Sequence, residues 1–298
     1  SFNVAIGSSA GQQVTTGVKN TFLGGLAGDA TTDADENVAI GYDSLGTNIL
    51  GGASVAVGAS ALRTQNPASA VTMYNTAVGH FAGYAVTTGT NNTLIGGLAG
   101  DGMTTGDNNV AVGYQALTTY NRTDGANSNN TAVGAGAFLA LTTGNANTAV
   151  GSEAGANQQG AANCTFLGYR AGKDSTGESN TFVGGLCGDA TDDGAENVAV
   201  GMSALSGNCG DGNTAVGKDA GEVITGSNNT VMGKSTGKSI TSGTNNLFLG
   251  KDAGITGSPG GNITTGSNDI ILGDENIDTA HIQVDWTVAS DQRDKTDF

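Results

Sequence analysis

The sequence is poor in the residues from which most catalytic and nucleic-acid sites are built. Of its 298 residues, 11 are Lys or Arg and 27 are Asp or Glu, which gives a formal charge of −16. Phosphate binding needs a basic patch, so we predict no nucleic-acid partner. The only histidines are His80 and His281, and no Ser-His-Asp or Cys-His set has a meaningful spacing. We therefore expect no enzyme of those classes.

Long apolar runs and a disulfide framework are also lacking. No run reaches membrane-spanning length and the first residues show no secretion signal, so we predict a soluble chain without membrane insertion. Because the chain begins at Ser1 and not at Met, we expect it to be a piece of a longer polypeptide. Cys164, Cys187 and Cys209 lie at three different phases of the repeat described next, so stacking would not align them and we expect free thiols.

Aromatic residues make up only 5% of the sequence, whereas glycine occurs 51 times. Small residues must then pack along a narrow core, which a stacked coil permits. A pentad of Asn, Val or Thr, usually Ala, a bulky aliphatic residue and Gly recurs sixteen times, mostly every 16 or 17 residues. Its glycines are Gly7, Gly24, Gly41, Gly58, Gly79, Gly96, Gly113, Gly134, Gly151, Gly168, Gly184, Gly201, Gly217, Gly233, Gly250 and Gly273.

The pentad predicts one short strand per copy. In a strand, positions two and four share a face and position three points the other way. Position four is always apolar and position two is Val or Thr in fourteen copies, so we expect these two positions to form the packed core column. Position three is never charged, which predicts that the second face is buried too. That face needs another layer, from the same coil or from a neighbouring chain.

The period predicts an all-β fold, a parallel β-solenoid (β-roll) of about 16 coils of 16–17 residues over residues 1–273. Ala recurs three residues after the pentad Gly, which indicates a second, shorter inward segment. The Asn that opens most pentads predicts a hydrogen-bonded ladder between coils. Residues 274–289 lose the period and alternate as a conventional strand with Trp286, so we expect them to cap the open end of the solenoid.

Three other functions compete for these motifs. Acidic turns, such as the one with Asp29, Asp33 and Asp35, either gather a cation or simply keep the rod soluble, and we expect no metal and no cofactor. A Thr column would suit ice binding, but that function uses two outward Thr ranks, and here the second rank is aliphatic and the Thr column looks buried. Polysaccharide cleavage would need two carboxylates facing each other across a groove.

Tyr42, Tyr114 and Tyr169 each follow a pentad Gly directly. An aromatic ring at that position can stack on a sugar, so the three are candidate glycan contacts along a groove. Position alone favours the plainer role of local packing within the coil.

Two resemblances add to these expectations. The Asn-Thr-Ala-Val-Gly repeats, about nine-tenths of the chain, resemble the head repeats of trimeric autotransporter adhesins and related repeats of phage tail fibre proteins. This resemblance implies three identical chains, intertwined or side by side around a common axis, which would cover the doubly apolar strand. The coils here are longer and less uniform than in the adhesins.

The second resemblance covers Ser290-Asp291-Gln292-Arg293-Asp294-Lys295. It is similar to the start of the endosialidase-type intramolecular chaperone at the C-terminus of phage tail spikes and fibres, and it would make residues 290–298 the first part of such a domain. The family cleaves itself at this Ser–Asp bond, which implies Ser290 as nucleophile, Asp291 after the cleaved bond and Lys295 as the assisting residue.

Together these features predict the distal part of a phage tail fibre, extracellular and located on the virion. The expected partners are the chain itself as a homotrimer, other tail fibre or tail proteins, and host cell-surface polysaccharide. The expected function is structural, as a rigid rod, combined with receptor binding. A bacterial trimeric adhesin head is the first alternative and a polysaccharide-cleaving tailspike the second.

Overall fold

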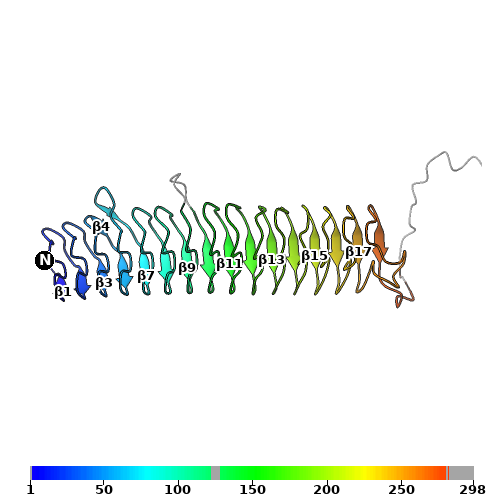
Figure 1. Cartoon of the computed structure of the whole chain (residues 1–298), viewed down its shortest axis with the longest axis horizontal. Coiled ribbons are helices and arrows are strands. Elements are labelled where there is room, and N and C mark those ends of the chain that lie inside the picture. Colours follow the sequence, from blue (N-terminus) through cyan, green and yellow to red (C-terminus); the bar gives the residue numbers. More distant parts are fainter. Residues whose placement is uncertain (1, 122–127, 280, 282–298) are drawn as a thin grey trace, which may run out of the picture.

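The computed structural model describes residues 2–121, 128–279 and 281 and is a rod of stacked coils (Figure 1). Sixteen strands form one parallel sheet in which the order of strands follows the chain. The bounds are β1 Val4–Ile6, β2 Thr21–Leu23, β3 Val38–Ile40, β4 Gly51–Gly52, β5 Val55–Val57, β6 Val71–Thr72, β7 Thr76–Val78, β8 Thr93–Ile95, β9 Val110–Val112, β10 Thr131–Val133, β11 Thr148–Val150, β12 Thr165–Leu167, β13 Thr181–Val183, β14 Val198–Val200, β15 Thr214–Val216, β16 Thr230–Met232, β17 Leu247–Leu249 and β18 Ile270–Leu272.

Each strand of the main sheet is the middle of one pentad, and neighbouring pentads pair in register. Ala39 of β3 pairs with Ala56 of β5, and Ala56 pairs with Ala77 of β7. The two remaining strands, β4 and β6, form a small parallel pair where the first insertion leaves the rod. The described residues contain no helix. The predicted parallel β-solenoid is confirmed.

The prediction of which strand face lies inside the coil is wrong. Position three points inward and is buried in every strand of the main sheet after β1, whereas positions two and four point outward and are half-buried or exposed. Leu23 and Met232, both at position four, are 44% and 48% exposed. The Thr column is likewise at the surface of a single chain, not in its core. The face left without a second layer is therefore the one with the bulky aliphatic residues.

Core volume is shared between position three and the residue four places after the pentad Gly. Where position three is large, as in Phe22, the later residue is Gly28, and a Cβ there would lie 2.5 Å from the Phe22 ring. Where position three is small, as in Ala39, the later residue is Leu45, which is fully buried. No coil before the last one has a large residue at both places. Four coils have a small residue at both, and there side chains of neighbouring coils fill the space, as Phe138 and Phe166 do beside Gly155.

The closing Gly of the pentad is required by close stacking of the coils. Gly96 has φ +133°, a region that side-chain-bearing residues rarely adopt. A Cβ on Gly96 would also lie 2.5 Å from the carbonyl oxygen of Gly113 in the next coil. Both restrictions recur along the glycine column, which explains why the motif ends on Gly in every copy.

The predicted Asn ladder is confirmed, and it links adjacent coils twice. The Asn92 Oδ1 accepts a hydrogen bond from the Asn109 backbone N–H at 3.0 Å, and the Asn92 Nδ2 donates to the Gly106 carbonyl at 2.7 Å. The other ladder asparagines are buried in the same way, except that Asn3 in the first coil is only half-buried. They are Asn20, Asn37, Asn75, Asn109, Asn130, Asn147, Asn180, Asn197, Asn213, Asn229 and Asn246.

The cysteines are free and buried, as predicted. Cys164 replaces a ladder Asn and its Sγ lies 3.4 Å from the Gly177 carbonyl, the place of the missing amide bond. Burial raises the pKa of all three thiols, that of Cys187 to about 12. At neutral pH they therefore remain protonated and act as small apolar residues.

The segment after β18 is described only in part. Residues 274–279 and 281 contain no strand. Most of the predicted capping strand, including Trp286, lies outside the described residues.

Candidate functional site

The residue that follows each pentad Gly lies at the end of the strand, where the chain turns away from the sheet. We call the stretch of this column from Tyr42 to Tyr169 the axial strip. In chain order it is Tyr42, Ala59, His80, Gly97, Tyr114, Ala135, Ser152 and Tyr169. The backbone carbonyls of the strip accept hydrogen bonds from the following coil, for example Ser60 N–H to Tyr42 O at 2.9 Å, so their spacing follows the coil spacing.

The three tyrosines singled out from sequence all lie on this strip and are solvent-accessible. Tyr42, Tyr114 and Tyr169 are 60%, 58% and 51% exposed. The structure does not bring them into one pocket, because several coils separate them. Tyr42 and Tyr114 lie beside Gly25 and Gly97 of the preceding coils, where a Cβ would be 3.6 Å and 3.7 Å from the ring. One part of each ring is supported and the remainder faces solvent.

Around the first part of the strip, aromatic and basic side chains gather. His80 packs edge-on against Phe81 with ring centroids 4.2 Å apart, and Phe81 packs against Tyr84 at 5.0 Å. The Arg63 guanidinium donates to the Asp43 carboxylate and, at 3.2 Å, to the Tyr84 hydroxyl. Arg63 is thereby held in one orientation beside the rings.

A groove opens between the coils that carry Tyr114 and Tyr169. Its volume is about 310 Å³. The floor is made of small or apolar residues such as Ala135, Gly136 and Leu139. Its polar lining residues are Gln115, Ser152, Glu153, Asn157 and Lys173.

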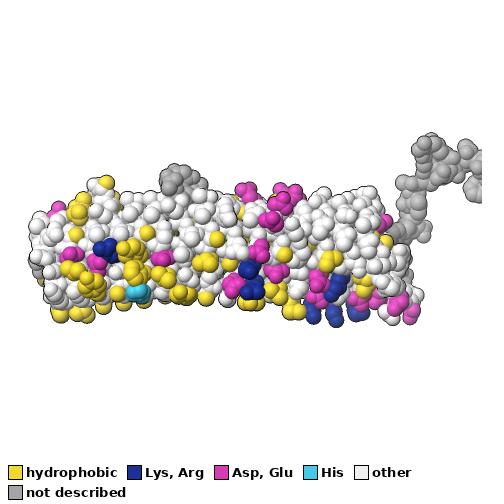
Figure 2. Space-filling model, in the orientation of Figure 1, with side chains coloured by type: hydrophobic (Ala, Val, Ile, Leu, Met, Phe, Trp, Pro, Cys, Tyr) yellow, Lys and Arg dark blue, Asp and Glu magenta, His cyan; other side chains and the backbone are white. Residues whose placement is uncertain are grey.

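Next to the groove residue Glu153, Arg170 contacts both a carboxylate and a ring. Its Nε lies 2.7 Å from the Glu153 Oε2, and its guanidinium carbon is 5.1 Å from the centre of the Tyr169 ring. The hydrogen-bonded ion pair with Glu153 raises the pKa of Arg170 above its usual value, so the guanidinium stays charged. Figure 2 shows apolar side chains, interspersed with clusters of basic and acidic side chains, along the lower half of the visible face.

Sequence reasoning missed most of the residues that surround the tyrosines. They are Arg63, His80, Phe81, Tyr84, Glu153, Arg170 and Lys173. They occupy the first, second and fifth places after the pentad Gly, and aligning the copies on that Gly would have shown these places as parallel columns. The sequence did not show that the fifth residue after the pentad Gly lies beside the first and second residues after it.

The acidic turns at the other end of the strands have a structural use. The Asp35 Oδ1 accepts the Val18 backbone N–H of the preceding coil at 2.7 Å, and the Asp107 Oδ1 accepts that of Thr90 at 2.6 Å. Glu36 forms an ion pair with Lys19 at 2.7 Å. These carboxylates tie each turn to its neighbour. Within residues 2–121, 128–279 and 281, no group of three or more His, Cys, Asp or Glu is placed to hold a metal ion.

Three carboxyls at equivalent places on the rod share a pKa shift. Burial raises the pKa of Asp29, Asp101 and Asp189, each the last residue of a Gly-Gly-Leu-Ala-Gly-Asp motif or its Cys variant. Nearby Asp43 raises the pKa of Asp29 further. The Oδ1 of Asp101 is buried without a hydrogen-bond partner. Because the same shift recurs in three copies of one motif, we assign it to the coil geometry and not to a catalytic pair.

The cleavage residues predicted by resemblance, Ser290, Asp291 and Lys295, lie outside the described residues. Comparison of the chain with family models, with curated proteins and with solved structures finds no match in any of the three. The part of the chain that the structure describes has no helix long and apolar enough to cross a membrane. The functional argument therefore rests on the rod and its surfaces.

Proposed function

We propose that this chain is the rod of a phage tail fibre, a homotrimer that bears the axial strip and adheres to host surface glycans. In this proposal it acts outside the cell as part of the virion, and its partners are two further copies, other tail proteins and host polysaccharide. The observation that carries the assembly is the outward face of the main sheet. That face has an aliphatic residue on every strand and no charged residue at positions two to four of any pentad.

The size of this face supports association between chains. Sixteen strands about 4.8 Å apart and three residues wide make a surface of roughly 75 Å by 10 Å, or about 750 Å². Its position-four column is apolar throughout and its position-two column is Thr in nine strands, so the apolar part alone is about as large as the 300–600 Å² patch that monomeric proteins seldom exceed. A stable interface buries about 800 Å² per partner. The number three comes from the resemblance of the repeats to trimeric adhesin heads.

Three copies of the strip would give the rod its adhesive character. Each contact between a ring and a sugar is weak, but chains in one rigid assembly present the same residues together. Once one strip is bound, the others meet the glycan at high effective concentration, so avidity exceeds the affinity of one strip.

The assembly is tested by the mass of the folded protein in solution. We expect light scattering to give three times the chain mass of 29.2 kDa. Substituting Val112, Val133 and Val150 by Lys should reduce the mass, because three cations would enter the apolar face. The matched control is Ala135→Lys, on the same stretch but at the place where Lys218 occurs naturally. A monomeric wild type at micromolar concentration would refute the trimer.

Two alternatives share this architecture, and experiments separate them. A bacterial adhesin head would be followed by a membrane-anchoring barrel, whereas a tail fibre would continue into the chaperone and cut itself after Ser290. A Ser290→Ala change in the longer polypeptide should then leave it uncut. A polysaccharide-cleaving tailspike would release oligosaccharides on incubation with host polysaccharide, and that release would overturn the non-enzymatic proposal.

A further inference from the structure

We propose that the axial strip binds a linear, uncharged polysaccharide that lies parallel to the rod axis. This inference rests on the glycan adhesion proposed above and adds the direction and the charge class of the ligand. It starts from the order of residues on the strip, in which aromatic rings alternate with very small residues.

The spacing of the rings sets the direction. Tyr42 and His80 are two coils apart, and so are His80 and Tyr114, with only Ala59 and Gly97 between them. At about 4.8 Å per coil these intervals are about 10 Å, which is roughly the length of two sugar rings in an extended chain. A glycan running along the axis would therefore meet a ring at about every second sugar. A glycan crossing the rod would meet only one.

The small residues keep the path open. Beyond Tyr114 the next two strip positions are Ala135 and Ser152, and the groove of about 310 Å³ lies beside them. Tyr169 closes this interval three coils further on. Along the strip, exposed aromatic rings therefore alternate with open intervals. The rings can stack on the apolar faces of sugars, and the intervals leave room for the sugars between them.

The charges beside the strip select an uncharged chain. The Arg63 guanidinium is bonded to Asp43, and Arg170 is bonded to Glu153. The third cation, Lys173, lines the groove near its polar residues. An acidic glycan would find both arginines neutralised by carboxylates and would approach a chain with net charge −16. Fixed carboxylate and guanidinium groups, in contrast, accept from and donate to sugar hydroxyls.

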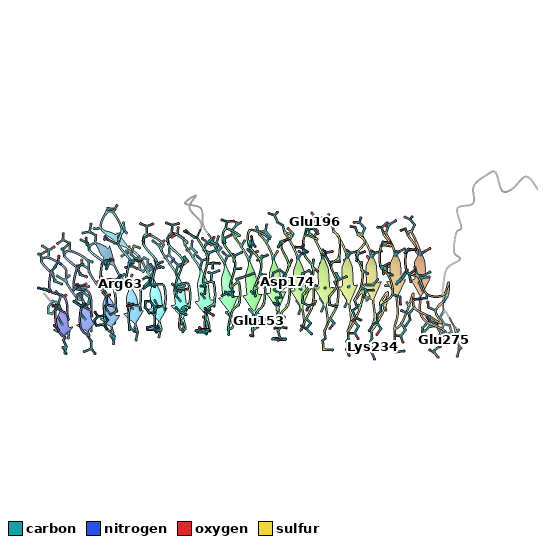
Figure 3. All side chains as sticks on the ribbon, in the orientation of Figure 1. Arg63, Glu153, Asp174, Glu196, Lys234 and Glu275 are labelled. Carbon is teal, nitrogen blue, oxygen red and sulfur yellow. The ribbon has the colours of Figure 1, made fainter. Side chains whose placement is uncertain are left out.

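The strip stops where its chemistry changes. After Tyr169 the same column continues as Gly185 and Met202 and then as Lys218, Lys234 and Lys251. Figure 3 shows Glu153 and Lys234 at the lower edge of the rod and Glu196 at the opposite edge. The ligand path therefore covers the coils from β3 to β12 and not the whole rod.

The test uses the assembled protein and two sets of purified bacterial surface polysaccharides, one linear and uncharged, the other acidic. We expect retention of uncharged chains, with affinity that rises from short to long chain-length fractions. Tyr114→Ala and Tyr169→Ala should each weaken binding about tenfold, the loss of one stacking contact. Both variants should fold, because Ala135 and Ala59 occupy the same column. The control is Tyr74→Ala, since Tyr74 is 61% exposed but lies before the pentad, at the other end of the strand.

Each outcome decides something different. Binding of uncharged chains that survives both tyrosine changes would overturn the strip while leaving glycan adhesion intact. Binding of acidic chains only would overturn the charge class. If no polysaccharide from either set binds, the proposed adhesion fails and the strip fails with it.

Discussion

Removing one asparagine of the ladder should weaken the contact between two adjacent coils and lower the free energy of unfolding by a predictable amount. The change is Asn92→Ala. The Asn92 side chain accepts from the Asn109 backbone N–H and donates to the Gly106 carbonyl. Asn109 and Gly106 are both buried, so water cannot replace the lost partner. Each buried group left without a hydrogen bond costs about 1–3 kcal/mol, so we expect a loss of about 2–6 kcal/mol.

The measurement combines denaturant unfolding with amide hydrogen exchange. In a solenoid each coil contacts only its neighbours, so the destabilisation should be local. Amide exchange detects such a local effect, whereas global unfolding averages it over the whole chain. We expect the Asn109 amide to be protected in the wild type and to exchange quickly in Asn92→Ala. The Asn92→Ser variant should lie between the two, since Ser54 replaces a ladder Asn naturally.

The matched control is the neighbouring Asn91→Gly. Asn91 is exposed and has φ +58°, a conformation that Gly adopts readily, so the change should stay within about 0.5 kcal/mol. If Asn92→Ala behaves like this control and the Asn109 amide stays protected, the ladder does not stabilise the stack and the reasoning is wrong.

Two further changes test the core and the acidic motif. Phe182→Ala should lower the unfolding free energy by about 3–5 kcal/mol through the cavity it leaves, and adding Gly188→Leu should restore a large part, which denaturant unfolding of both variants will show. The raised pKa of Asp101 means that its charge disfavours the fold above the folded-state pKa, and that stability rises as pH falls through that pKa. Asp101→Asn should therefore be more stable than the wild type at pH 7, and its stability should no longer rise as the pH falls. Equal stability of the two proteins at pH 7 would contradict this.

Much of the fold follows from one five-residue motif. Its period gives the strands, their parallel register and the Asn ladder, because in-register stacking brings identical residues together. Gly96 shows why the motif is so regular, since the site rejects any Cβ both sterically and by its φ. The pairing of β4 with β6 did not follow from sequence, because β6 lies in the longer interval before β7, where the period is broken.

The direction of the strand faces did not follow from sequence either, and the reason is physical. Alternation tells which residues share a face but not which face lies inside when both are apolar. The signal that resolves it is pairwise: Phe22 goes with Gly28, and Ala39 goes with Leu45. Large and small residues exchange between these two places because both fill the same space, so position three must be the inward one.

The candidate site was predicted only as three separate tyrosines. Their place after the pentad Gly was enough to put them on one exposed column. Arg63 and Tyr84 come from five residues after the Gly, and only the path of the turn brings them back beside the first two places. A repeat motif therefore predicts which equivalent residues of successive coils stack along the rod axis better than it predicts contacts between different positions of one coil.

The reversed faces change the argument about assembly. If position three were outside, the free face would be mostly Ala with a few Phe, which a monomer tolerates more easily. With position three inside, the free face has an aliphatic residue on each strand and a Thr or Val beside most of them. Burial of the Thr column no longer argues against ice binding, and only the aliphatic second rank does. The proposed trimer would cover both ranks, whereas a monomer would leave an exposed Thr and Val surface that needs a different explanation. The mass of the folded protein therefore decides the function of this surface as well as the number of chains.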